Sequence, residues 1–146
     1  MMYHVVNPET AGGWGERTRS TTVPGQPTIV HELDCEFDDW LGDELLAVPV
    51  CYIVTEGLAG EINRAGLSGV VFDHVVISKS GEFEDWHPDG LDLPKFLWMK
   101  VVGEAGRDDF GLVGDFELVV SDKALAVLQS RPLQHAIIDV FEPGER

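Results

Sequence analysis

The sequence predicts a single-domain α+β protein, residues 1–146, with a mixed β-sheet, a few short helices and a strand–helix–strand unit that occurs twice. Three observations lead to this prediction. The chain has 146 residues, which is enough for one domain whose core needs no disulfide or metal. Apolar runs of strand length alternate with short helical patterns. Two distant segments repeat the same order of apolar run, capping residue, helix and breaker.

The composition is that of a folded, strongly acidic protein. Hydrophobic residues make up 44% and charged residues 25% of the chain, which excludes wholesale disorder. Acids outnumber Lys and Arg by 26 to 10, so the formal net charge is −16. Such a field repels nucleic-acid backbones and anionic membranes, so we expect neither as a partner. No apolar run has the length of a membrane span.

The start of the chain and its cysteines predict a cytoplasmic protein. Residues Met1 to Val6 have neither the basic nor the long apolar region of a secretory signal. Without such a signal, Cys35 and Cys51 are expected to be reduced and buried. Their spacing matches no zinc motif, and we expect no cofactor.

The N-terminal part is expected to be irregular. Residues 7–27 are rich in Gly, Pro, Thr and Ser, which is typical of a long loop or a partly mobile arm. Trp14 lies between glycines in this segment, and we expect its ring to pin the loop to the body of the protein.

An acidic stretch follows, from Ile29 to Asp43. Its larger apolar residues recur at helical spacing: Leu33, Phe37, Trp40 and Leu41. This pattern predicts a short amphipathic helix with an acidic outer face. A strand over residues 28–35 followed by a helical turn is the alternative.

The internal repeat compares residues 52–75 with residues 118–141 at an offset of 66 positions. Ile53-Val54-Thr55-Glu56 aligns with Val119-Val120-Ser121-Asp122, and Val71-Phe72-Asp73 aligns with Ile137-Ile138-Asp139. Each copy therefore reads as strand, helix and strand.

Local chemistry supports a helix in each copy. Thr55 and Ser121 are suited to cap the two helices, and an acid follows each of them where the helix dipole favours a negative charge. Gly66 and Pro132 are breakers that end the two helical patterns.

Between the two copies we expect a polar loop and a strand, and the second copy should begin with a turn. Residues 78–94 are polar, and residues 95–102 form an apolar run of strand length. Residues 108–114 are expected to turn into a strand over residues 116–120.

No motif of a known catalytic class is present: the sequence has no phosphate loop, dinucleotide fingerprint, nucleophile elbow or His-Glu-x-x-His pattern. The segment from Glu82 to Gly90 is the best candidate for a functional loop. Its residues His87, Asp89 and Asp85, together with His74 from outside the segment, could ligate a divalent metal. The alternative is a solvated turn with Trp86 packed on the core.

Acids interleaved with aromatic residues point to a protein partner with a basic surface. Clustered carboxylates steer the encounter, and aromatic rings provide anchors. The predicted contact residues combine both features: Glu36, Asp38, Asp39, Trp40, Glu84, Asp85 and Trp86. The alternative is an acidic surface that only keeps the protein soluble.

The repeated unit resembles a segment of small acidic immunity proteins, which bacteria encode beside polymorphic or contact-dependent toxins. The resemblance lies in Thr55-Glu56-Gly57-Leu58-Ala59 through Ala65 to Phe72, and in the second form from Val120 to Leu133. It implies stoichiometric inhibition of a cognate toxin, without catalytic residues. It assigns no individual binding residue.

The sequence therefore favours an acidic, cytoplasmic inhibitor that covers a basic cleft of its partner and imitates the charge of a nucleic acid. Two other hypotheses stay open. One is a metal-assisted enzyme built on the loop of His87 and Asp89. The other is a structural or regulatory protein that associates with itself through a sheet edge.

Overall fold

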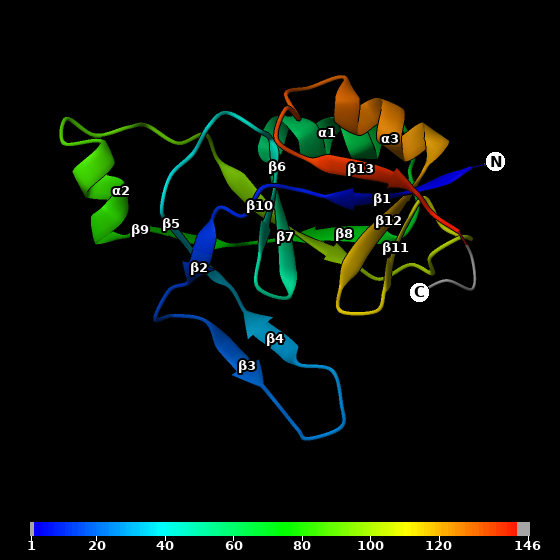
Figure 1. Ribbon diagram of the computed structural model, residues 1–146, viewed down its shortest axis with the longest axis horizontal. Helices are drawn as coiled ribbons and strands as arrows, with labels where there is room; N and C mark the ends of the chain where they lie inside the picture. Colours follow the sequence, from blue (N-terminus) through cyan, green and yellow to red (C-terminus); the bar gives the residue numbers. More distant parts are fainter. Residues whose placement is uncertain (1, 143–146) are drawn as a thin grey trace.

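The computed structural model describes residues 2–142 and confirms the α+β fold (Figure 1). Two four-stranded antiparallel sheets form its body. Sheet A has the order β11 (Phe110–Val113), β12 (Glu117–Ser121), β1 (Tyr3–Asn7) and β13 (Ile137–Val140). Sheet B has the order β6 (Leu45–Val48), β7 (Cys51–Thr55), β10 (Phe96–Val101) and β8 (Val70–Asp73).

The two sheets confirm the repeat, because they share one topology. In each, a hairpin leads into a helix, and an edge strand follows that helix. Ile53 and Asp73 lie opposite the same residue of β10, whereas Val119 and Asp139 lie opposite the same residue of β1. The strand pairing therefore reproduces the offset of 66 positions found in the sequence.

The third strand of each sheet comes from outside its repeat unit. β10 follows the first unit along the chain and completes sheet B. β1 precedes both units and completes sheet A, so sheet A joins the two ends of the described chain. Figure 1 shows β1 beside β13.

The two repeat helices are capped as the sequence predicts. The hydroxyl of Thr55 accepts a hydrogen bond from the Leu58 N–H at the start of α1 (Glu56–Arg64), at 3.1 Å. The hydroxyl of Ser121 accepts one from Ala124 at the start of α3 (Asp122–Gln129), also at 3.1 Å. Gly66, at φ 68°, ends the first helix in the left-handed conformation that glycine tolerates. The two helices contact each other beside the sheets (Figure 1).

Strand β7 is buried on both faces and separates two apolar clusters. Tyr52 and Val54 face a cluster with the two helices and sheet A. Cys51 and Ile53 alternate with them and face a second cluster, which contains Phe37 and other side chains from the N-terminal half. Sheet B is therefore the middle layer of the fold.

The mixed sheet that the sequence predicts is small. In sheet C, β5 (Asp34–Phe37) pairs antiparallel with β2 (Gly12–Trp14) and parallel with β9 (Val76–Lys79). Sheet D is a hairpin of β3 (Arg19–Thr21) and β4 (Ile29–Glu32), which projects from the body in Figure 1.

The segment 7–27 is more regular than expected, because it contains β2 and β3. Trp14 pins it as predicted: its indole N–H donates to the Pro49 carbonyl at 2.8 Å. The helix predicted for residues 29–43 is wrong. Its place is taken by β4 and β5, so the alternative of a strand in this region is nearer to the structure.

Two further expectations need correction. Residues 78–94 are not only a loop, because they include the end of β9 and helix α2 (Gly81–Trp86). Residues 108–114 hold strand β11 rather than a turn alone. The strands expected near residues 95–102 and 116–120 are confirmed as β10 and β12.

Both cysteines are free and buried, as predicted. Burial is the main cause that raises the pKa of each thiol to about 12. Neither Cys35 nor Cys51 is therefore a reactive thiolate near neutral pH.

Candidate functional site

The structure brings the two acidic segments together through one side-chain contact. Nε2 of His87, at the end of α2, lies 2.7 Å from Oδ1 of Asp39, which follows β5. We define the acidic face as the surface on both sides of this contact: Asp38, Asp39, Trp40, Glu84, Asp85 and Trp86. Glu36, also predicted to bind the partner, lies in β5 and is half-buried.

Helix α2 is held by one buried ring and presents another to solvent. Ser80 caps the helix by accepting a hydrogen bond from the Phe83 N–H at 3.2 Å. The Phe83 ring is buried, with the His87 ring 4.9 Å away. Trp86, on the last turn, is 67% exposed. The alternative in which Trp86 packs on the core is therefore wrong.

Trp40 has a more structural place than Trp86. Its indole N–H donates to the Asp43 carbonyl at 2.8 Å, and its ring meets the Phe96 ring edge-on at 6.1 Å. The side chain is half-buried, so one part of the ring supports the fold and another faces solvent.

The contact with His87 also sets the charge of Asp39. The hydrogen bond from His87 is the largest cause that lowers the pKa of this carboxyl below its ordinary value of 3.8. A lowered carboxyl pKa stabilises the folded protein above the ordinary value and loses that effect as pH falls through the lowered one. The link between the two acidic segments is therefore strongest above about pH 4.

The predicted metal ligands do not gather in the structure. No group of three His, Cys, Asp or Glu side chains suited to a metal ion occurs within residues 2–142. His87 is engaged by Asp39, whereas Asp85, Asp89 and His74 are exposed.

Two acids that look like surface residues in the sequence are buried. Asp34 is 2% exposed and accepts a hydrogen bond from the Ser78 hydroxyl at 2.7 Å. Asp43 is 1% exposed, and its two oxygens accept the backbone N–H groups of Gln134 and His135, each at 2.8 Å. Neither residue belongs to the acidic face.

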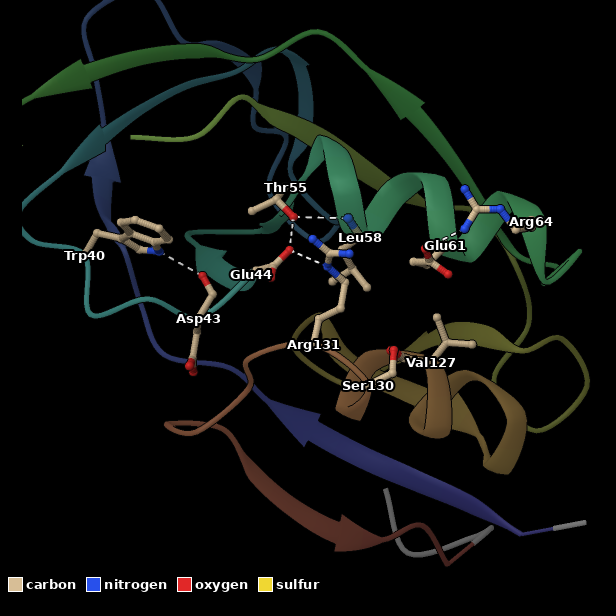
Figure 2. A network of polar contacts seen from close by, with 10 residues as sticks. All are labelled: Trp40, Asp43, Glu44, Thr55, Leu58, Glu61, Arg64, Val127, Ser130 and Arg131. Atoms are coloured by element: carbon tan, nitrogen blue, oxygen red, sulfur yellow. Dashed lines mark hydrogen bonds and ion pairs between the residues drawn. The ribbon is translucent and has the colours of Figure 1, made fainter. Parts of the chain in front are cut away.

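A cleft of about 490 Å³ opens next to Trp40, and sequence reasoning missed it. We call it the Trp40 cleft and define it by its lining residues: Trp40, Gly42, Glu44, Thr55, Glu56, Gly57, Pro94, Lys95, Arg131 and Pro132. Figure 2 shows a polar network in its wall. Oε1 of Glu44 receives the Thr55 hydroxyl at 2.5 Å and Nε of Arg131 at 2.7 Å.

Glu9, near these acidic segments, has a carboxylate oxygen without a hydrogen-bond partner in the described part of the chain. Its Oε2 atom is buried and has no hydrogen-bond partner within the described chain. Burial is the main cause that raises the pKa of Glu9 above its ordinary value of 4.5, and Asp43 and Asp39 raise it further. His135 opposes this shift.

Replacing Glu9 with glutamine should therefore stabilise the protein at neutral pH. A raised carboxyl pKa favours folding at low pH, and this effect is lost as pH rises from the ordinary value through the raised one. We expect Glu9→Gln to raise the melting temperature by about 1–3 °C at pH 7 and to have little effect near pH 4. Thermal unfolding at both pH values measures this, with exposed Glu16→Gln as control. An equal shift at both pH values would contradict the ionisation argument.

Comparison of the chain with protein-family models, curated proteins and solved structures gives no match. Within residues 2–142, no helix has the length and apolar character needed to cross a membrane.

Proposed function

We propose that this protein is an acidic protein-binding module that inhibits a cognate toxin, or a similar partner, by covering a basic surface. The observation that carries the proposal is the exposure of Trp86 on a short acidic helix. A large aromatic side chain in contact with solvent is a typical interface anchor, because its burial removes much apolar area from water.

The surroundings of Trp86 favour a basic partner. Exposed carboxylates flank it in α2, and His87 joins this helix to the segment of Asp38 and Asp39. Leu41, 56% exposed, adds an apolar side chain to that segment. A net charge of −16 attracts a basic surface over several ångströms, so that the charges steer the encounter and the apolar groups hold the complex.

The proposed mechanism is occlusion, so it needs no catalytic residue. A negative face that covers a basic substrate cleft would imitate the charge of a nucleic acid and exclude the substrate from the cleft. We include a cytoplasmic location in the proposal because both cysteines are free, which is typical of a reducing compartment.

Charge reversal on the acidic face should slow association. The partner is first captured from a lysate of the native host at low and at moderate salt and identified by mass spectrometry. Asp38, Glu84 and Asp85 are then changed together to lysine; none of these side chains makes a hydrogen bond within the described chain. We expect the association rate constant to fall by about 10- to 100-fold and its salt dependence to flatten.

A control variant separates this surface from the overall charge. Glu16, Asp115 and Asp139 are exposed and outside the acidic face, and their change to lysine alters the net charge equally. If both triple variants associate at the same reduced rate, the acidic face has no special role.

Trp86→Ala tests the anchor: we expect it to weaken binding by at least about 30-fold without loss of folding stability.

A further inference from the structure

The Trp40 cleft has apolar walls and a polar end. Its volume of about 490 Å³ lies within the range of sites that bind small molecules or single side chains. The Trp40 ring and two proline rings, of Pro94 and Pro132, supply the walls. The indole N–H of Trp40 is occupied by the Asp43 carbonyl, so the tryptophan offers the cleft apolar surface and no donor.

The polar end has unused hydrogen-bond donors. Within residues 2–142, the Arg131 guanidinium makes one hydrogen bond, from Nε to Glu44, although its side chain is only 36% exposed. Its terminal amino groups therefore stay available. One of them lies against the helix at Gly57, where an added Cβ would be 2.6 Å from Nη2. Figure 2 shows the guanidinium between Glu44 and the start of α1.

The charges of the cleft leave Arg131 as the group that recognises an anion. Oε1 of Glu44 accepts hydrogen bonds from both Thr55 and Arg131, so the charge of this carboxylate is already paired. Glu56 pairs with Lys95 at 3.2 Å on the exposed rim. The two cations of the cleft, Arg131 and Lys95, thus match its two carboxylates, Glu44 and Glu56, in charge. The terminal amino groups of Arg131 can still pair with one further carboxylate in a bidentate manner. A polyanion would meet the repulsion of the whole protein.

The second repeat unit forms the same helix cap without an arginine. There Ser121 caps α3 and donates to Oδ1 of Asp109 at 2.6 Å, as Thr55 does to Glu44. Asp109 also accepts hydrogen bonds from the N–H and the hydroxyl of Ser68. At the equivalent place in the first unit, Glu44 accepts one from the guanidinium of Arg131. The same frame therefore forms without an arginine.

The position of Lys95 makes the same point. The carbonyl of the residue before β10, Lys95, accepts the first N–H of α1, and the carbonyl of Met2, before β1, accepts the first N–H of α3. The backbone role is shared by both units, whereas a lysine occupies this position in the first unit and a methionine in the second. The backbone frame of the cap therefore does not depend on the side chain at the position of Lys95.

We propose that the Trp40 cleft binds a carboxylate carried on an apolar body. The carboxylate pairs with the terminal amino groups of Arg131, and the apolar part packs between the Trp40 ring and the two prolines. Such a ligand is either a small organic acid or the C-terminal residue of a peptide. The site shares Trp40 with the acidic face but needs neither Trp86 nor the charges of α2, so it can be tested independently of the function proposed above.

The test uses small probes and an unusual pair of variants. N-acetyl-phenylalanine represents a peptide C-terminus, phenylacetate a free acid, and N-acetyl-phenylalanine amide lacks the charge. Binding is followed by NMR through the indole N–H of Trp40 and the Nε–H of Arg131. Gly57→Ala places a methyl group against the guanidinium, whereas Gly60→Ala, in the same helix, meets nothing within 4 Å. Both changes favour the helix, so neither should unfold the protein.

We expect the acids to shift both signals and the amide to bind at least tenfold more weakly. Gly57→Ala and Arg131→Lys should each weaken acid binding at least tenfold, and Gly60→Ala should leave it unchanged. The tighter of the two acids then assigns the source of the ligand. The proposal is overturned if no acid binds, if acid and amide bind equally, or if Gly57→Ala binds like Gly60→Ala. Because the test involves no protein partner, its failure leaves the inhibitor proposal unaffected.

Discussion

Replacing Asp43 with alanine should destabilise the fold by about 2–4 kcal/mol, since it removes two hydrogen bonds to a buried charged group. The carboxylate is 1% exposed and accepts two successive backbone N–H groups, at Gln134 and His135. It thereby fixes the connection between α3 and β13 to the segment before β6. Without the carboxylate, both N–H groups lose the acceptor that they have in the structure.

Thermal unfolding measures this effect, and we expect the melting temperature to fall by about 5–15 °C. Asp38→Ala is the matched control, because this nearby acid is half-buried and its side chain makes no hydrogen bond within residues 2–142. Asp43→Asn retains one acceptor and should lie between the two. If Asp43→Ala and Asp38→Ala melt together, the carboxylate does not hold the connection.

Gly111→Ala should be as damaging, at about 3 kcal/mol, for a steric reason. Gly111 lies in β11 and is buried, and a Cβ added to it would be 2.2 Å from the Ala105 backbone nitrogen and 2.5 Å from its Cα. No real Cβ contact is that short, so either β11 or the turn before it must move. Because both partners are backbone, no side-chain rotation can relieve the overlap.

The matched control is Gly13→Ala, also in a strand, where an added Cβ meets nothing within 4 Å. Urea unfolding of the two variants compares their free energies of unfolding directly. We expect Gly13→Ala to stay within about 0.5 kcal/mol of the parent protein. Equal stability of the two variants would contradict the prediction, because the backbone at Ala105 could then move away from the added methyl group without cost in stability.

The repeat could be predicted from sequence because its signals are local. A hydroxyl residue and an acid at the start of a helix, and a breaker after it, act within a few residues of chain, and Thr55 and Ser121 indeed cap α1 and α3. The exchange of third strands could not be predicted. No strand is predicted at residues 3–7, and nothing in that segment indicates which strands lie beside β1.

The helix predicted for the acidic stretch is wrong because two periods coincide in its sequence. Leu33 and Phe37 are four residues apart, which fits a helix, but Cys35 between them is equally buried, as expected for one face of a strand. Acidic side chains are mostly exposed in proteins, whereas Asp34 and Asp43 are buried hydrogen-bond acceptors. A buried carboxylate satisfied by distant hydrogen-bond donors has no local sequence signal.

The candidate site could be predicted only in part, because its composition is a local signal and its assembly is not. The density of charge and aromatic residues identified both segments of the acidic face, but only the fold places His87 against Asp39, 48 positions away. The Trp40 cleft draws on four distant parts of the chain. One signal was available: Arg131 is a rare cation in an acidic chain and stands just before a proline, where it cannot belong to the helix that ends there.

The position of β1 in the middle of sheet A has a consequence for synthesis on the ribosome. β1 ends at Asn7, and its partner β12 begins at Glu117, so roughly 110 residues must be translated before the two can pair. At about 5–20 residues per second this takes about 6–22 s. Throughout that interval Val5 and Val6, both fully buried in the finished protein, have no native partner. Sheet B, whose strands are complete once β10 has emerged, can form first. The unpaired β1 segment can then pack against this sheet until β12 has been made.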